Sequence, residues 1–271
     1  MAEQRFRKAQ VVGSTPAIGS RRRNRHRKLS RADERASMVS AGRDVGQADN
    51  RGMLLVENAF SSIVLTAQSF NPSVFTETWL SESKVLPSDK LTGVRVYSPQ
   101  VAQFQTSEVQ VLVVPPKMQI TFPILVPGEG PELACSIAVR TVELLPHTPY
   151  QALGMNFDYF VPPPEGQDFN VYDRALFGDG GSKLLREFSA PDARFGRYFS
   201  RDYGEARLKL DVKPVKAGPQ NKDLLQFSFN FHYALPEVHL EERSRNLSRM
   251  IGTWGQLRDY SQQLAELGSQ L

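Results

Sequence analysis

The chain has 271 residues, of which 40% are hydrophobic and 23% are charged, a balance that supports a folded core and excludes a wholly disordered protein. No apolar run approaches the roughly 18 residues of a membrane span, and no N-terminal segment joins a basic start to an apolar stretch and a cleavage site. We therefore expect a cytoplasmic protein without a membrane partner.

The first 52 residues differ in charge from the rest of the chain. They hold 13 Lys or Arg and 5 Asp or Glu, a formal charge of +8, whereas the other 219 residues hold 20 bases and 24 acids, a formal charge of −4. Because this segment lacks hydrophobic periodicity, we expect a disordered basic tail. It is a nucleic-acid-binding arm or a nuclear-import signal, a solvated tail, or sequence ahead of a true start at Met53. The candidate nucleic-acid residues are Arg21, Arg22, Arg23, Arg25, Arg27 and Lys28.

Residues 53–149 are predicted to form the first of two α+β halves. Alternating apolar residues predict a strand over about 61–68. Asn71 and Pro72 mark a helix start, because the Asn side chain accepts backbone N–H groups and proline suits the first helical position. Strands are then expected near 99–105, 107–114 and 117–122, followed by a helix over about 131–145.

Residues 150–271 repeat this order of elements. The predicted elements are a strand over 152–161, helices near 167–177 and 182–188, strands near 193–200, 205–213 and 223–233, and a long helix from about Glu237 to Leu267. The expected fold class is α+β: a curved antiparallel sheet with helices on one face, built from two pseudo-repeated β-α-β-β-β-α halves. This internal duplication is a prediction about topology, because no residue-level repeat accompanies it.

The strand at 223–233 shows the sharpest separation of its two faces. Phe227, Phe229 and Phe231 alternate with polar residues, which is typical of an antiparallel strand covered on one side only. The uncovered face is expected to collect Thr66, Gln68, Gln110, Gln119, Thr121, Asn156, Asp158, Gln226, Ser228, Asn230 and His232. Because it lacks the excess of Lys and Arg that binds phosphates, it suits a protein partner, a second copy of the chain, or solvent.

The C-terminal helix has apolar residues on two adjacent heptad lines, among them Trp254 and Leu257. Such a stripe serves either a dimer or packing on the protein's own sheet. Ser261 interrupts one line, and Gly252 and Gly255 weaken the helix by roughly 1 kcal/mol each. These interruptions favour packing on the sheet.

Signals for chemistry are weak. The stretch Phe177 to Leu185 departs from a phosphate-binding loop because Lys183 follows Ser182, so we expect a flexible turn. The four histidines lack metal-ligand spacing, and the sequence predicts no metal site and no cofactor. Asp158 and His232 are candidates for an acid/base pair if their strands adjoin. Cys135 is expected to be a small core residue.

Two segments carry a resemblance: Phe70 to Pro72, and LPHTPYQALGMNFDYF from Leu145 to Phe160. The chain is similar there to a sporadically distributed bacterial family of uncharacterised proteins with a Leu-Pro-His segment followed by a Gly-x-Asn-Phe strand. The resemblance implies a bacterial protein and transfers no catalytic residues. The order of elements alone also resembles the fold of the TATA-box-binding protein, but the near-neutral open face argues against DNA binding there.

The sequence favours a non-enzymatic interaction or assembly module that binds a protein partner or forms a homo-oligomer. The expected binding residues are Asn156, Gln226, Ser228 and Asn230 on the sheet, with Trp254 and Leu257 on the helix. Two alternatives stay open. One is a small-ligand-binding protein or hydrolytic enzyme that uses Asp158 and His232, and the other is nucleic-acid binding by the basic tail.

Overall fold

The computed structural model describes residues 57–123, 129–178, 189–217, 221–236 and 239–268. All of them belong to one compact unit, Asn50–Leu271. The basic tail with its candidate nucleic-acid residues lies outside the described residues. So does the helix expected at 182–188.

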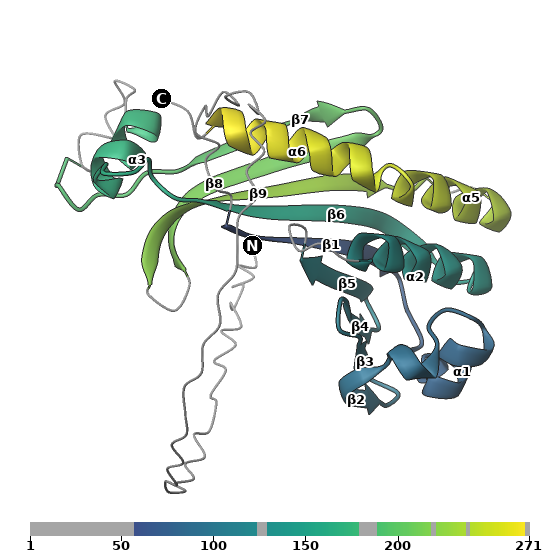
Figure 1. Cartoon of the computed structure of the whole chain (residues 1–271). Helices are drawn as coiled ribbons and strands as arrows, with labels where there is room; N and C mark the ends of the chain where they lie inside the picture. The colour runs from purple at the N-terminus through teal and green to yellow at the C-terminus, as the bar shows by residue number, and fades with distance from the viewer. Residues whose placement is uncertain (1–56, 124–128, 179–188, 218–220, 237–238, 269–271) are drawn as a thin grey trace, which may run out of the picture. The chain divides into compact units, whose positions relative to one another are not determined.

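One nine-stranded antiparallel sheet, curved and not closed, runs through this unit (Figure 1). Its strand order is β2-β3-β4-β5-β1-β6-β9-β8-β7. The strands are β1 Glu57–Ala67, β2 Thr92–Tyr97, β3 Ala102–Gln105, β4 Gln110–Val114, β5 Lys117–Pro123, β6 Tyr150–Val161, β7 Arg197–Tyr203, β8 Ala206–Ala217 and β9 Lys222–Ala234. This architecture confirms the predicted α+β class.

The stretches predicted as the first and second halves meet in the sheet at β1 and β6. In each half the first strand pairs with the last, β1 with β5 and β6 with β9, and the two first strands pair with each other at Ile63 and Met155. The first half has one strand more than expected, because β2 was missed. Gly93 has a positive φ of 64° and the register shifts between Thr92 and Val96, which interrupts the alternation that identifies a strand.

The helices are α1 Glu77–Glu82, α2 Gly130–Leu144, α3 Phe169–Phe177, α5 Leu240–Ile251 and α6 Trp254–Gly268, with short 3-10 turns at Pro72–Val74 and Ser88–Lys90. Figure 1 shows α2, α5 and α6 along the same side of the sheet. The predicted cover on one face is therefore observed. The small α1 lies next to α2, where the Arg140 guanidinium donates to the Ser83 carbonyl at 3.2 Å.

The long C-terminal helix of the sequence prediction is in fact two helices. Gly252 ends α5, with its N–H bonded to the Ser248 carbonyl, and the Thr253 hydroxyl donates to the Met250 carbonyl at 2.7 Å. The Thr253 carbonyl then accepts from Leu257 as α6 begins. The helical periodicity continues through this point, and only the low helix propensity of Gly252 signals the break.

Local sequence signals explain where several helical elements begin. The Asn71 side chain accepts from the Ser73 N–H at 3.1 Å, so the predicted cap forms, but it begins the 3-10 turn Pro72–Val74 and not the predicted helix. Thr76 caps α1 in the same way through Trp79, at 3.2 Å. Asp168 caps α3.

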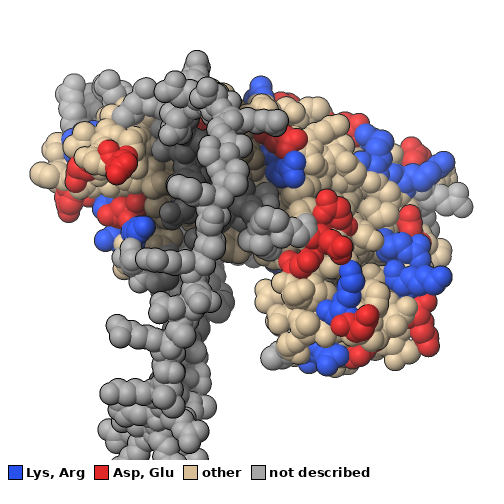
Figure 2. Space-filling view, viewed as in Figure 1, with Lys and Arg blue, Asp and Glu red and all other residues tan. Residues whose placement is uncertain are grey.

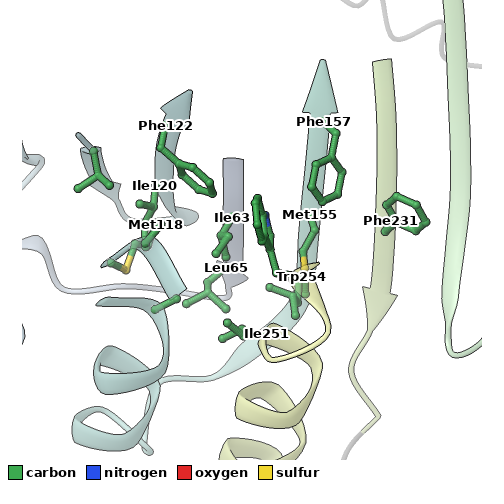
Figure 3. Close-up of a cluster of buried hydrophobic side chains, with 14 of the residues drawn as sticks. Ile63, Leu65, Met118, Ile120, Phe122, Met155, Phe157, Phe231, Ile251 and Trp254 are labelled. Atoms are coloured by element: carbon green, nitrogen blue, oxygen red, sulfur yellow. The ribbon is translucent and has the colours of Figure 1, made fainter. Parts of the chain in front are cut away.

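The core lies between the sheet and these helices, and Figure 3 shows its centre. Side chains of β1, β5 and β6 contact Trp254 of α6, whose ring is 5.5 Å from Phe122 and 5.7 Å from Phe157 between centroids. Phe227, Phe229 and Phe231 are almost fully buried on the same side. Burial of each such side chain contributes about 1.5–3 kcal/mol to stability. The buried residues of the helices and of the strands before and after residue 150 form one continuous hydrophobic cluster, so the unit has a single core.

Candidate binding surface

The side of the sheet away from the core carries polar side chains that are mostly half-buried. We call this surface the polar sheet face. Because strand residues alternate, it takes the even-numbered residues of β1, β6 and β9 and the odd-numbered residues of β8. Its central members are Phe60, Ser62, Asn156, Asp158, Lys209, Asp211, Gln226, Ser228, Asn230 and His232.

Three neighbouring strands are joined by a side-chain hydrogen-bond chain at the middle of this face. The side-chain amide of Asn230 on β9 donates to the side-chain oxygen Oδ1 of Asn156 on β6 at 2.6 Å. The side-chain amide of Asn156 in turn donates to the Ser62 hydroxyl of β1 at 3.0 Å. Asn156 and Asn230, predicted separately as binding residues, are thus direct neighbours. These bonds fix the amide orientations before any ligand arrives.

A second group of predicted residues gathers around Asp158. Its Oδ1 atom accepts hydrogen bonds from the Ser228 hydroxyl and from the Gln226 amide, the latter at 3.1 Å. Within the described residues Oδ2 has no hydrogen-bond partner, and it is not among the fully buried polar atoms. One carboxylate oxygen therefore stays available to a ligand.

A hollow of about 390 Å³ opens over these two groups. Lys209 and Asp211 of β8 and Tyr198 of β7 line it as well. Asp211 forms an ion pair with Lys213 at 3.3 Å, whereas Lys209 is exposed and forms no ion pair with a described residue. The hollow thus presents a free carboxylate oxygen and a free ammonium group on opposite sides of β9.

Two exposed aromatic side chains end one row of the polar sheet face. Strand pairing aligns Phe60, Asp158, Ser228, Asp211 and Tyr198 across five adjacent strands. Phe60 is 47% exposed and Tyr198 is 62% exposed. With about 4.8 Å between strands, the row spans about 19 Å along the sheet. Neither aromatic residue was predicted from the sequence, because Phe60 lies just before the first predicted strand and no apolar/polar alternation surrounds Tyr198.

The proposed pairing of Asp158 with His232 is wrong. Both side chains lie on the polar sheet face and their strands adjoin, but His232 pairs with Gly154 whereas Asp158 pairs with Ser228. Four residues of strand separate the two positions, about 13 Å. An acid/base pair needs contact at hydrogen-bond distance or through one water, so these two residues do not form one.

The helix residues predicted to bind a partner are part of the core. Trp254 is 5% exposed and Leu257 is 2% exposed. The alternative of packing on the protein's own sheet is therefore the one that the fold realises, because the apolar stripe of α6 faces β6 and β9. Among the predicted binding residues, the four on the sheet remain accessible.

Among the described residues of β3, β4 and β5 on the polar sheet face, Lys117 is the only charged one. A smaller hollow of about 150 Å³ lies among the glutamine side chains of these strands. The residues lining this smaller hollow are Gln103, Gln110, Val111, Leu112, Gln119 and Thr121.

The side of the molecule visible in Figure 2 carries charges of both signs. Lys and Arg are interspersed there with Asp and Glu.

The described residues contain no cluster of three or more His, Cys, Asp or Glu side chains able to hold a metal ion. None of their helices has the length and apolar character needed to cross a membrane. Compared with known proteins, the chain matches no family model and no curated protein sequence.

Proposed function

We propose that this protein is a non-enzymatic interaction module whose polar sheet face binds a polypeptide segment of another protein. One observation carries the proposal: the hydrogen-bonded centre formed by Asn156, Asn230 and Asp158 lies between the exposed aromatic side chains of Phe60 and Tyr198. Aromatic side chains are enriched at protein interfaces, where they often act as anchors for a partner.

The chemistry of the face favours a polypeptide over a nucleic acid. Counterion release needs a clear excess of Lys and Arg, but here Asp158, Asp202 and Asp211 offset the bases of β8. Amide and hydroxyl groups match the hydrogen-bonding groups of a peptide. The free Asp158 oxygen and the Lys209 ammonium group suit a segment that carries both a basic and an acidic side chain.

The dimensions fit a short extended segment. At about 3.3 Å per residue, the 19 Å row from Phe60 to Tyr198 matches about six extended residues. Such a segment lies across the strands, over the hollow, with apolar side chains near each end to meet the two aromatic rings.

The test compares matched variants in partner capture from source cells and then in calorimetric titration with the purified partner. Phe60→Ala and Asp158→Asn change the proposed surface, and Val171→Ala removes an exposed apolar side chain from α3. We expect Phe60→Ala to weaken binding about 10-fold or more, and Val171→Ala to leave it unchanged. Equal binding by all three variants and the parent chain would contradict the proposal.

The hollow also supports a second candidate, a small ligand with separate ammonium and carboxylate groups. The observation that favours it is the placement of Asp158 and Lys209 in one open hollow of small-ligand size. Thermal-shift assays with free amino acids and dipeptides separate the two candidates. A shift that Asp158→Asn and Lys209→Met both abolish supports the small ligand.

A further inference from the structure

The two edges of the sheet differ in how they are protected. At one edge, the register of β2 shifts between Thr92 and Val96, and Arg95 holds an ion pair with Glu77 at 2.9 Å. At the other edge, β7 pairs with β8 in unbroken register over seven residues. Among the described residues, only β8 pairs with β7, whose other side is therefore an open strand edge (Figure 1).

Strand β7 is also the most exposed strand of the sheet. Six of its seven residues are exposed, and they include Phe199, which is 48% exposed. The sequence RYFSRDY contains no proline and no glycine, so every residue can take part in a ladder with a further strand. An open edge of this length is a template for pairing with another extended chain, and charges, proline or bulges are what usually block such pairing.

We propose that β7 pairs with β7 of a second copy of this protein, forming a two-fold dimer with one continuous sheet. A two-fold axis perpendicular to the sheet pairs the residues before its centre with those after it. With the axis at Ser200, the strand pairs along its whole length: Ser200 with itself, Phe199 with Arg201, Tyr198 with Asp202, and Arg197 with Tyr203.

Self-complementarity of charge selects this register. Each charged side chain faces an aromatic ring of the second copy, which places Arg201 beside Phe199 and Asp202 beside the hydroxyl of Tyr198. An axis at Phe199 sets Arg197 opposite Arg201, an axis at Arg201 sets that residue opposite itself, and an axis at Asp202 opposes two carboxylates. Like charges directly opposite each other destabilise a ladder.

The dimer extends the proposed function without depending on it. Because the axis is perpendicular to the sheet, the polar sheet faces of both copies lie on the same side and meet at β7. If the protein is a monomer that binds a partner through the polar sheet face, only the dimer proposal is wrong. If it is a dimer that binds no partner, only the proposed function is wrong.

The position on the axis gives a direct test with the full chain. Ser200→Asp and Ser200→Lys each place two like charges opposite each other, whereas an equimolar mixture pairs Asp with Lys. Light scattering coupled to size exclusion measures the mass over a concentration series, and circular dichroism verifies the fold. The same two substitutions at Gln110, exposed on β4 away from either edge, serve as matched controls.

We expect the parent chain and both Gln110 variants to approach twice the 30.4 kDa chain mass as concentration rises. For each Ser200 variant alone, we expect the dissociation constant of the dimer to rise about 10-fold or more. The equimolar mixture is expected to regain the dimer. A monomeric parent chain, dimeric Ser200 variants, or a mixture that stays dissociated would each overturn the proposal.

Discussion

The indole N–H of Trp254 donates a hydrogen bond to the Ser61 hydroxyl at 3.1 Å, joining the start of α6 to β1. Ser61 in turn donates to the backbone carbonyl of Asn156 on β6, at 2.9 Å. These two hydrogen bonds thus tie the C-terminal helix to both central strands. The opposite side of those strands holds the Asn156 amide of the polar sheet face, so the core supports the binding surface directly.

Trp254 is therefore predicted to be a major source of stability. Trp254→Ala should lower the free energy of unfolding by about 3–5 kcal/mol through the cavity that it leaves. Trp254→Phe should cost about 1–3 kcal/mol, because the Ser61 hydroxyl loses its donor while most of the ring contact remains. Urea denaturation measures both values. Gln263→Ala, exposed on the same helix, is the control and should change little. A loss below 1 kcal/mol for Trp254→Ala would contradict the shared core.

Asp173 should make stability depend on pH. Burial raises the pKa of this carboxyl above its usual 3.8, although the Phe195 N–H at 2.7 Å and the nearby Arg194 and Arg174 partly offset that rise. The folded state then binds a proton more tightly than the unfolded state, so stability decreases as the pH rises above about 4.

Asp173→Asn tests this sign, because asparagine keeps an acceptor for Phe195 but carries no charge. Urea unfolding at pH 4 and pH 7 gives the free energy of unfolding of the variant minus that of the parent chain. We expect this difference to be more favourable to the variant at pH 7 than at pH 4. Asp192→Asn, at an exposed position, provides the comparison. The same difference from the parent chain at both pH values would show that the buried charge carries no penalty.

The single cysteine should react slowly while the protein is folded. Burial, with a smaller contribution from Glu132, raises the pKa of the Cys135 thiol to about 11 from its usual 9.0. The thiolate fraction at pH 8 is then about 100-fold lower than in the unfolded chain. Iodoacetamide labelling followed by mass spectrometry measures this difference. Labelling at equal rates with and without urea would contradict the helical packing at Cys135.

The folded unit should not bind nucleic acid through its sheet. Because acids offset bases on the polar sheet face, a form that begins at Met53 is expected to bind duplex DNA no more tightly at 50 mM than at 200 mM salt. Fluorescence anisotropy measures the affinity. If the full chain binds and the shorter form does not, the basic tail is responsible. Steeply salt-dependent binding by the shorter form would assign that function to the sheet instead.

The fold was accessible from the sequence because alternation reports burial directly. The burial of the β9 phenylalanines and the cap at Asn71 each followed from local chemistry, and both are observed, although Asn71 begins a 3-10 turn and not a longer helix. The site was only partly accessible, since alternation tells which face a residue takes but not its register across strands. Asn156 and Asn230 happen to be opposite each other, whereas Asp158 and His232 do not. Tyr198 joins the site only through the pairing of β7 with β8.

The most direct measurement of the central claim is photo-crosslinking in source cells from a benzoyl-phenylalanine placed at one position at a time. Placed at Phe60, on the polar sheet face, the probe is expected to crosslink the chain to a distinct partner polypeptide. Placed at Val171, on α3, it is expected to give no such product. Crosslinks from position 171 with none from position 60 would contradict a docking surface on the open side of the sheet.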